Sequence, residues 1–454
     1  NLGVFTQIGN STNWSSVAAG KFVTLALDNQ NKLYSWGSSL YGSLNKGEFS
    51  FNTNIRQIGT SQDWDKVYAG INHSGGIKTD GTLWTWGRNQ FGQLGNGTTL
   101  NNPTPARLGS DADWKMISLS YFHSLGLKSN GTLWSWGSNN SGQLGDGSTT
   151  NSSVPIQIGT NTNWKIISSG YNSSYAIKNN GTLWAWGLNS FGQHGNGNNT
   201  NSNIPTQIGT NADWASVRVG HDQSTAMKRD GSVWTWGFNI EGQLGDGTTV
   251  SKNVPTRITL TDIAKWPITM FSGHNFVLKN DGTLWSWGYN YYGQLGDGTT
   301  VDKYVPAKMG TEIDWRDVAS GGYHSMAIKN NGSLWSWGND LFGQLGQGTD
   351  FNFSPSEAKP IARIYISDRS NYCANGSLVL TASEGLSYTW STGATTRSIT
   401  VNTSGTYSVT VRYPIGDVST SESIFIPARQ NTTLSTTGSM TLNRLEDLKT
   451  YKLS

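Results

Sequence analysis

Apolar and polar residues alternate along most of the chain in short runs that are separated by Gly, Pro, Asn and Asp. Alternation with a period of two, in runs this short, is typical of strands that bury one face. The stretch 114–163 contains four such runs, at 114–120 (WKMISLS), 124–129 (SLGLKS), 132–137 (TLWSWG) and 154–159 (VPIQIG). Asn130-Gly131, between the second and third runs, predicts a two-residue hairpin turn of type I′, because both residues adopt positive φ at low cost. The stretch therefore predicts four antiparallel strands.

The same unit recurs along the first three quarters of the chain. A Trp opens each unit, first at intervals of 50 residues and then of 52 and 49, at Trp14, Trp64, Trp114, Trp164, Trp214, Trp266 and Trp315. A Trp-Gly step ends the third strand of each unit, at Gly37, Gly87, Gly137, Gly187, Gly237, Gly288 and Gly338. Seven units of four antiparallel strands predict an all-β protein whose residues 1–360 form a seven-bladed β-propeller.

The first residues of the chain predict how the ring closes. Residues 5–9 (FTQIG) keep the Gln-Ile-Gly pattern of the other fourth strands, whereas residues 354–358 (SPSEA) in the last unit have lost it. We therefore expect the N-terminal segment to be the outer strand of the last blade, which removes a seam from the ring.

Trp and His recur at fixed positions of the unit, which favours a structural role for them. Twenty of the 21 Trp fall within the units, and only Trp390 lies outside. We expect these Trp to pack between blades, with an aromatic sugar-binding platform as the alternative. Five His precede the second strand: His73, His123 and His324 at one position, and His221 and His274 at another. His194 replaces the Leu of the Gly-Gln-Leu-Gly sequence and has no evident partner.

Lysines also recur, just before the Asn/Asp-Gly turns, at Lys78, Lys128, Lys178, Lys228, Lys279 and Lys329. The repeat places them as a ring on one face of the propeller. We expect solvated strand ends beside turn carboxylates. The alternative is a weak footprint for an anion or a polysaccharide.

The unit Trp-x-Trp-Gly-x-Asn-x-x-Gly-Gln-Leu-Gly-Asp/Asn-Gly resembles the regulator of chromosome condensation repeat, and the resemblance covers about residues 4–360. It implies a seven-bladed propeller. Members of this family include an exchange factor for a small GTPase, a β-lactamase inhibitor protein and many bacterial surface proteins, so the resemblance implies a fold and not a function. Nucleotide exchange is disfavoured, because the nearly equal units leave no inserted element to act on a GTPase.

Composition and charge exclude several function classes. The 32 basic and 29 acidic residues give a net charge of +3, which over 454 residues provides no strong field for nucleic acid or an anionic membrane. A single Cys excludes an internal disulfide framework and a multi-cysteine metal site. No run of 18 apolar residues predicts a transmembrane segment. We find no paired carboxylates, Ser-His-Asp set or phosphate loop, so we expect no enzyme, cofactor or metal.

One face of the predicted propeller carries variable aromatic side chains. In a four-stranded meander, the loops after the first and third strands lie at the same end, opposite the Asn/Asp-Gly turns. Candidate partner-binding residues in these loops are Phe191, Phe238, Ile240, Tyr289, Tyr291, Tyr292 and Phe342. Further aromatics there are Phe22, Tyr41, Phe91, Tyr121, Phe122, Tyr171 and Tyr323. Variable aromatic loops on a repeated scaffold favour binding of a protein or glycan, and the alternative is that several of them plug the loops.

After residue 360 the pattern changes. Residues 361–428 contain six short strands and resemble the immunoglobulin-like β-sandwich modules of secreted Bacteroidota proteins. Those modules often carry a second cysteine, whereas Cys373 here has none to pair with. Residues 429–454 resemble a linker and the opening strands of the sorting domain of the type 9 secretion system, although Leu434-Ser-Thr stands where that family expects Asn-Pro-Thr. The resemblance implies export through secretion-system components recognising the C-terminus, to the outer-membrane surface or the extracellular space.

These features together favour a non-enzymatic, secreted or cell-surface binding protein. It would be adhesin-like, in the company of gliding-motility adhesins, with the propeller as its recognition head. Two alternatives remain: a soluble enzyme inhibitor of the β-lactamase-inhibitor type, and a polysaccharide-binding lectin. Nucleic acid is not expected as a partner.

Overall fold

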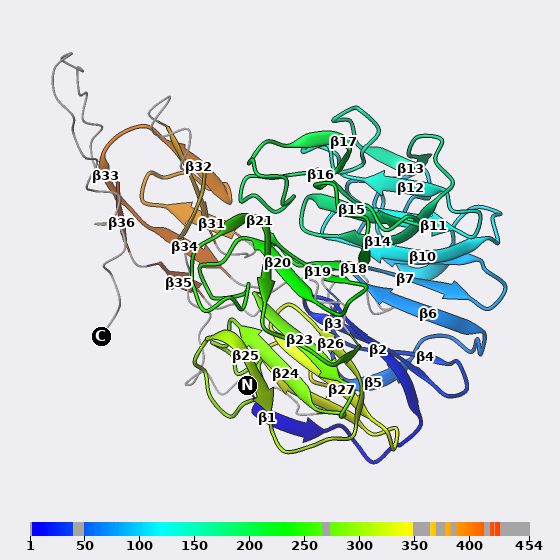
Figure 1. The fold of residues 1–454 in the computed structure, drawn as a ribbon. Coiled ribbons are helices and arrows are strands. Elements are labelled where there is room, and N and C mark those ends of the chain that lie inside the picture. The colour runs from blue at the N-terminus through cyan, green and yellow to red at the C-terminus, as the bar shows by residue number, and fades with distance from the viewer. Residues whose placement is uncertain are drawn as a thin grey trace. The chain divides into compact units, whose positions relative to one another are not determined.

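A computed structural model describes residues 2–39, 50–265, 273–347, 364–368, 377–382, 387–412, 418–421 and 423–426. Every regular element among them is a strand (Figure 1). The chain forms two compact units, residues 1–350 and 351–454.

The first unit is a ring of seven four-stranded antiparallel sheets, which confirms the predicted propeller. Blades one to three are β2 (Trp14–Ala19), β3 (Val23–Asp28), β4 (Leu33–Ser39), β5 (Ser50–Gln57); β6 (Trp64–Ala69), β7 (His73–Lys78), β8 (Leu83–Gly87), β9 (Asn102–Arg107); and β10 (Trp114–Leu119), β11 (His123–Lys128), β12 (Leu133–Gly137), β13 (Ser152–Gln157). Blades four and five are β14 (Trp164–Ser169), β15 (Ser173–Lys178), β16 (Leu183–Gly187), β17 (Ser202–Gln207); and β18 (Trp214–Val219), β19 (Gln223–Lys228), β20 (Val233–Gly237), β21 (Lys252–Ile258). Blades six and seven are β22 (Ile263–Lys265), β23 (His274–Lys279), β24 (Leu284–Gly288), β25 (Lys303–Met309); and β26 (Trp315–Ser320), β27 (His324–Lys329), β28 (Leu334–Gly338), β1 (Leu2–Gln7).

The N-terminal strand closes the ring as the sequence predicts. β1 pairs antiparallel with β28, with Thr6 opposite Ser336, and the Ile8 amide donates to the Leu334 carbonyl at 2.8 Å. Phe5 packs edge-on against Trp315 and Trp337, at ring-centroid distances of 5.1 and 4.7 Å. The N-terminus is therefore anchored in the core of blade seven. Residues 354–358 lie outside the described residues.

The hairpin turn at Asn130-Gly131 exists, but its predicted type is wrong. The Lys128 amide donates to the Thr132 carbonyl, which leaves three loop residues, 129–131, in place of two. Only Gly131 has a positive φ, of 79°. Asn130 instead accepts hydrogen bonds through its side chain from the Thr132 amide (3.0 Å) and hydroxyl (2.7 Å). This is a type I turn followed by a glycine in the left-handed conformation, in which the asparagine acts through its side chain.

Blade six begins at a different residue from the one that the Trp spacing indicates. Ile263 pairs with Lys279 in the way that Trp114 pairs with Lys128, so Ile263 and not Trp266 holds the first position of this blade. Trp266 itself lies outside the described residues. The stretch from Ile263 to His274 is two residues longer than the corresponding stretch from Trp114 to His123. A buried apolar position accepts Ile as well as Trp, so the motif alone could not fix the register.

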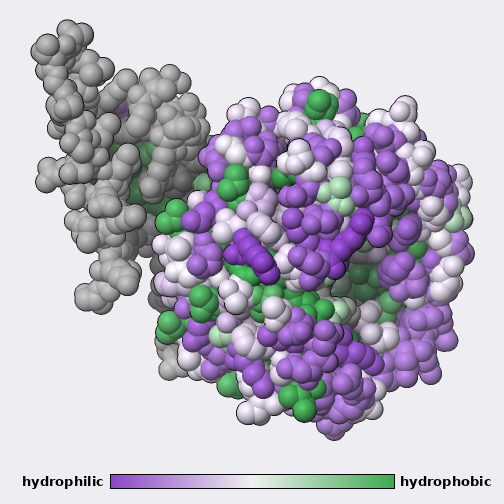
Figure 2. Space-filling view, in the orientation of Figure 1, coloured by the Kyte–Doolittle hydropathy of each residue, from purple (hydrophilic) through white to green (hydrophobic). Residues whose placement is uncertain are grey.

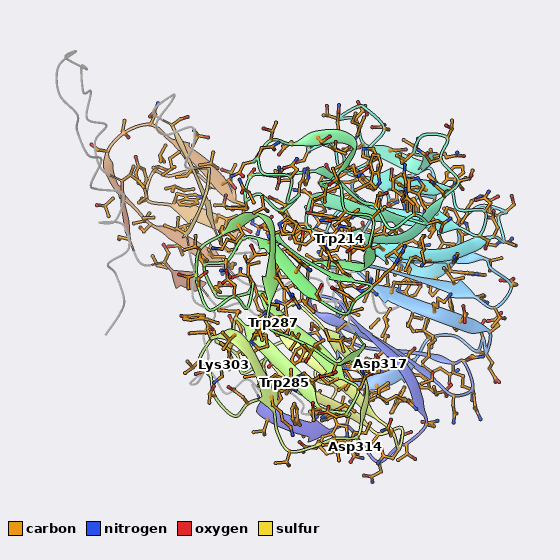
Figure 3. The ribbon with its side chains drawn as sticks, viewed as in Figure 1. Trp214, Trp285, Trp287, Lys303, Asp314 and Asp317 are labelled. Carbon is orange, nitrogen blue, oxygen red and sulfur yellow. The ribbon has the colours of Figure 1, made fainter. Side chains whose placement is uncertain are left out.

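The propeller core lies between neighbouring blades. The Trp before each Trp-Gly glycine is fully buried: Trp36, Trp86, Trp136, Trp186, Trp236, Trp287 and Trp337. Trp136 also donates from Nε1 to the Gln93 carbonyl of the preceding blade at 2.8 Å, and Trp287 donates likewise to Gln243 at 3.1 Å (Figure 3). These Trp therefore fill the space between blades and hydrogen-bond across it, which confirms their predicted structural role.

The second unit contains three small sheets, of order β29-β30-β32, β31-β34-β35 and β33-β36. Its strands are β29 (Ile364–Asp368), β30 (Leu378–Ala382), β31 (Ser387–Trp390), β32 (Ser398–Val401), β33 (Gly405–Tyr407), β34 (Val409–Arg412), β35 (Val418–Thr420) and β36 (Ile424–Ile426). Trp390 and Tyr407 are buried among its aliphatic residues. The immunoglobulin-like assignment stays a prediction, and Cys373 and residues 429–454 lie outside the described residues.

Candidate functional site

The lysine ring lies at the end of the propeller that carries the Asn/Asp-Gly turns, which we call the turn face. Lys128 lies between the rings of Trp114 and Trp134, with Nζ 5.1 and 4.8 Å from their centroids. Its Nζ also pairs with Asp111 at 2.7 Å and Asp113 at 3.2 Å. Lys78, Lys228 and Lys329 are held in the same way between two Trp and beside one Asp. The lysines do lie beside carboxylates, but the prediction that they are solvated is wrong, because the Trp rings cover them.

Lys178 departs from this pattern. It lies between Trp164 and Trp184, but Asn163 stands where the other blades that carry the repeated lysine have an Asp. Burial lowers the pKa of Lys178, whereas Lys128, despite its burial, has a raised pKa because of its bonds to Asp111 and Asp113. The Oδ1 atom of Asn163 is buried and has no hydrogen-bond partner. Blade four thus keeps the aromatic part of the clamp and lacks the carboxylate.

Four histidines link neighbouring blades and are fully buried. The Nε2 atoms of His73, His123, His274 and His324 lie 3.0, 2.8, 3.1 and 3.0 Å from hydroxyl oxygens of the next blade. Burial lowers the pKa of each to about 3. His274 belongs with the other three, opposite the Trp-Gly glycine, and not with His221 as the residue count suggested. The two extra residues in blade six account for the shift.

His194 and His221 have other surroundings. His194 is buried in blade four, where its ring lies edge-on to Tyr175, and burial lowers its pKa to about 4. His221 lies at the opposite end of the propeller from the turn face. Its Nδ1 contacts the carboxylate of Asp222, and its ring stacks on Tyr171 at a centroid distance of 4.2 Å.

The loops after the first and third strands of each blade form that opposite end, which we call the loop face. Three predicted partner-binding side chains are exposed there: Phe191 by 40%, Ile240 by 61% and Tyr291 by 52%. The other four, Phe238, Tyr289, Tyr292 and Phe342, are half-buried. Tyr121 is buried as a loop plug, and Tyr41 lies outside the described residues.

The half-buried aromatics join the loops of neighbouring blades. Phe342 meets Phe22 at 4.8 Å, Tyr292 meets Tyr323 at 5.1 Å, and Phe91 meets Phe122 at 4.7 Å between ring centroids. In each pair the long loop of one blade leans on the short loop of the next. The half-buried aromatics therefore pack between loops, as the alternative of loop plugs predicts, whereas the contact surface stays a prediction that the exposed side chains leave open.

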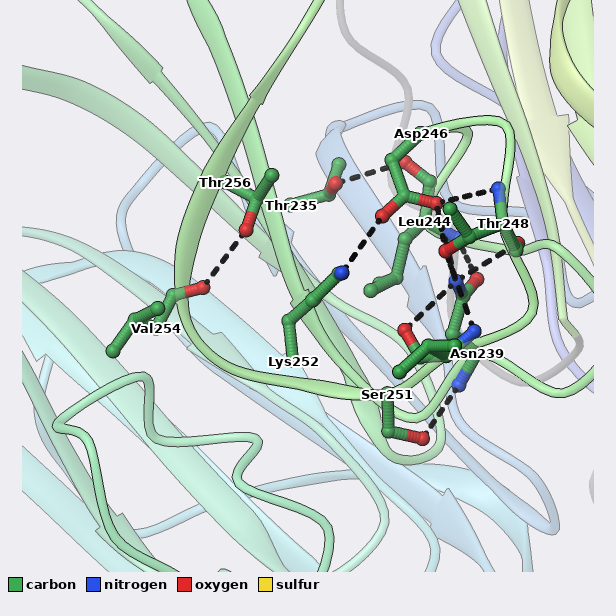
Figure 4. Close-up of polar contacts among 10 residues, drawn as sticks. Thr235, Asn239, Leu244, Asp246, Thr248, Ser251, Lys252, Val254 and Thr256 are labelled. Atoms are coloured by element: carbon green, nitrogen blue, oxygen red, sulfur yellow. Dashed lines mark hydrogen bonds and ion pairs between the residues drawn. The ribbon is translucent and has the colours of Figure 1, made fainter.

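Polar side chains fix the backbone of the long loops. In blade five, Asn239 accepts from the Leu244 amide at 2.8 Å and donates to the Thr248 and Val250 carbonyls at 3.0 and 3.1 Å (Figure 4). Asp246 accepts from the Thr248 amide at 3.0 Å. Equivalent bonds recur in blades two, four and six, at Asn89, Asn189 and Asn290. The repeat thus holds the loop backbone and leaves the neighbouring side chain, here Ile240, free to vary.

The sequence reasoning missed one titratable group on the loop face. Glu241 occupies the position of Phe91, Phe191 and Tyr292 in the other blades. Its pKa is raised to about 7, chiefly by burial and also by the nearby Asp302, while His221 acts in the opposite direction. The departure of a carboxylate from an aromatic repeat position was the available signal.

Within the described ranges we find no cluster of three or more side chains suited to a metal ion. The same residues include no helix long and apolar enough to cross a membrane.

Comparison with known proteins places the first unit. Residues 5–316 match the family described as RCC1-like domain, and residues 315–344 match the regulator of chromosome condensation (RCC1) repeat. Human WBSCR16 is 21% identical, with 74% of this chain and 88% of that chain covered and a TM-score of 0.63. Prp20p of Saccharomyces cerevisiae is 21% identical, with 72% and 82% covered and a TM-score of 0.60. Likeness at such identities concerns the fold.

Proposed function

The chain belongs to the RCC1-like domain family, and on that premise we propose that it is a binding protein that holds a protein or glycan partner on the loop face. The observation that carries this proposal is the set of exposed apolar side chains on fixed loops: Phe191, Ile240 and Tyr291. Catalysis forms no part of it.

The fold itself does not require apolar residues at these positions. In blade three, Ser138, Asn140 and Ser141 stand where blade six has Tyr289, Tyr291 and Tyr292. Aromatic anchors in the centre of an interface contribute about 2 kcal/mol or more each. Loops already fixed by hydrogen bonds lose little conformational entropy on binding. An exposed anchor on a rigid loop is therefore suited to recognition.

The comparisons support a protein partner in particular. Prp20p has binding properties toward Gsp1p and histones, and in a second structure yeast RCC1 (Prp20) is bound to Kap60. A glycan partner is supported by the exposed ring of Tyr291, which stacks on Tyr289 at an interplanar angle of 7° and on which a sugar ring can pack. An inhibitor of a single enzyme is a third outcome, which partner capture distinguishes from the other two.

We further propose that the protein is a secreted or cell-surface adhesin, exported as cargo of the type 9 secretion system and associated with gliding. Two features of the second unit support an immunoglobulin-like spacer. Trp390 is buried in its core, and the Tyr407 hydroxyl donates to the Thr403 carbonyl at 2.9 Å, the hydrogen bond of a tyrosine corner. The export assignment rests on the resemblance of residues 429–454 to a sorting domain.

The test compares two faces that carry matched side chains. Ile240 on the loop face is 61% exposed, and Ile313, between blades six and seven on the turn face, is 64% exposed. The full chain is used to capture partners from outer-membrane, surface-polysaccharide and soluble-enzyme fractions. We expect Ile240→Ala with Tyr291→Ala to weaken capture at least roughly tenfold and Ile313→Ala to leave it unchanged.

The captured material identifies the function. Surface polymer or outer-membrane protein supports an adhesin, and one folded enzyme supports the inhibitor alternative. If the double variant captures the same partner as the original protein, the loop face is not the binding surface.

A further inference from the structure

The centre of the propeller contains a cavity of about 210 Å³ between the innermost strands of six blades. Its walls come from β2, β6, β10, β14, β18 and β26, and most of them are aliphatic, with Val67, Met116, Ile117, Ile167 and Val318 among them. Figure 2 shows apolar side chains within the hollow at the centre of the ring. Ligand sites for drug-sized molecules enclose roughly 300–1,000 Å³, so this cavity suits a smaller molecule.

Arg218 is the basic residue of this wall. The equivalent positions of other blades carry Ala18, Tyr68, Ser118, Ser168 and Ala319, as the strand registers show. Four of these five residues are small and the fifth is Tyr68, so none of them is charged, whereas blade five places a long cation there. A cation at a position where the scaffold accepts alanine is not needed for the fold.

The guanidinium of Arg218 is only partly satisfied. One Nη donates to the Val217 carbonyl at 2.9 Å, while Nε is buried and has no hydrogen-bond partner. Among the described residues, no carboxylate forms an ion pair with it. Burial lowers the pKa of Arg218, and the nearby Tyr68 acts in the opposite direction.

The acidic residue of the wall, Asp317, does not take the place of a counterion. It lies on β26, separated from β18 by blade six, and its Oδ1 accepts from the Val318 amide at 2.9 Å (Figure 3). Arg218 as a whole is half-buried, with its Nε fully buried. Taking a cation partly out of water without an anion is costly, and an anion that binds beside it removes that cost. The rigid fork of an arginine suits the two oxygens of a carboxylate.

We propose that the axial cavity binds a short aliphatic carboxylate, with its carboxylate on Arg218 and its alkyl chain against Val67, Met116 and Ile117. The wall is mostly aliphatic, so it offers a contact surface to an alkyl chain, which inorganic phosphate lacks. This site is separate from the loop face, so it does not rest on the function proposed above.

The experiment measures binding of sodium butyrate to the full chain by saturation-transfer NMR and by thermal melting. Butyramide has the same shape without the charge, and we expect it to bind at least roughly tenfold more weakly than butyrate. Arg218→Gln should lower the affinity for butyrate by a similar factor. Arg229→Gln, which changes an exposed arginine of the same blade, should leave it unchanged.

Three results would overturn the proposal. They are equal affinity for butyrate and butyramide, unchanged butyrate binding by Arg218→Gln, and binding of inorganic phosphate but not of butyrate. The butyramide comparison uses the unaltered protein, so it decides the proposal whatever the stability of the variant. The double variant Ile240→Ala, Tyr291→Ala should bind butyrate normally, which separates this site from the loop face.

Discussion

The turn face and the loop face of the propeller are built by the same repeat, yet they use their polar and aromatic residues differently. On the turn face, two Asp neutralise the charge of Lys128, and its side chain covers the rings of two Trp. On the loop face, Asn239 binds the backbone of its own loop and leaves Ile240 exposed. At the turn face the repeated side chains thus bind one another. At the loop face they fix the backbone of a loop that exposes a variable residue.

The comparison also explains which substitutions the repeat tolerates. At the turn face, Asn163 in blade four replaces the carboxylate that pairs with the lysine in blades two, three, five and seven. At the loop face, Phe191, Ser141 and Glu241 occupy one repeat position without disturbing the surrounding hydrogen bonds, since the next residue but one, Gln193, Gln143 or Gln243, binds the backbone amide in each case. Variation therefore removes an ion pair at the turn face and leaves the loop hydrogen bonds intact at the loop face.

We expect the largest effect on stability from acid, because protonation of the histidines that link neighbouring blades would weaken the ring that both faces share. His73, His123, His274 and His324 have a folded-state pKa of about 3, against an ordinary value of 6.5. Between these values the unfolded chain binds more protons than the folded one, so stability is full above pH 6.5 and falls as the pH drops. At pH 5.5 each His should cost about 1.4 kcal/mol, or about 6 kcal/mol for the four.

Urea unfolding at pH 7.5 and at pH 5.5 measures this loss. His274→Asn should reduce the loss between the two pH values by about 1.4 kcal/mol, because the contribution of one such His is removed. A free energy of unfolding that is the same at both pH values would contradict the assignment of neutral, buried histidines.

The turn face should give a smaller effect that differs between blades. Lys128→Ala leaves Asp111 and Asp113 without their cation and opens space between two Trp, so we expect a loss of about 2 kcal/mol. Lys178→Ala removes a buried cation that has no Asp beside it, and we expect a loss of less than about 1 kcal/mol.

The two lysine variants serve as controls for each other in urea unfolding at pH 7.5. Equal losses would show that the Trp rings alone hold the lysines, and that the carboxylates add nothing. A larger loss for Lys178→Ala would reverse the interpretation of both blades.

The loop face should give the smallest effect on stability. Tyr291→Ala removes an exposed ring and should change the free energy of unfolding by less than about 0.5 kcal/mol. Tyr292→Ala removes a half-buried ring that packs on Tyr323, and we expect a loss of about 1–2 kcal/mol. Thermal melts of the two variants test this division, and equal melting temperatures would show that Tyr292 is no more a part of the scaffold than Tyr291.

Much of the propeller could be predicted because its information is local and repeated. The alternation of residues predicts each strand, and seven copies reveal the ring. The Gln-Ile-Gly pattern at residues 7–9 even predicts the closing strand, which pairs with β28 as expected. The register of blade six could not be predicted: the Trp spacing points to Trp266 at a position that Ile263 holds, and it displaces His274 as well. The spacing of Trp residues cannot reveal that blade six has two extra residues between its first position and His274, because Ile263 holds that first position and a Trp occurs three residues later.

The sequence by itself determined the class of the fold, the number of blades, the closure of the ring and the end of the propeller at which variable aromatics gather. These properties depend on the period of two and on repetition, which are written along the chain. Only the tertiary structure decided which aromatics are exposed, that the lysines lie between Trp rings, and that Arg218 enters a central cavity. Each of these depends on contacts between residues of different strands or blades, and such contacts determine which side chains are buried and what they bind.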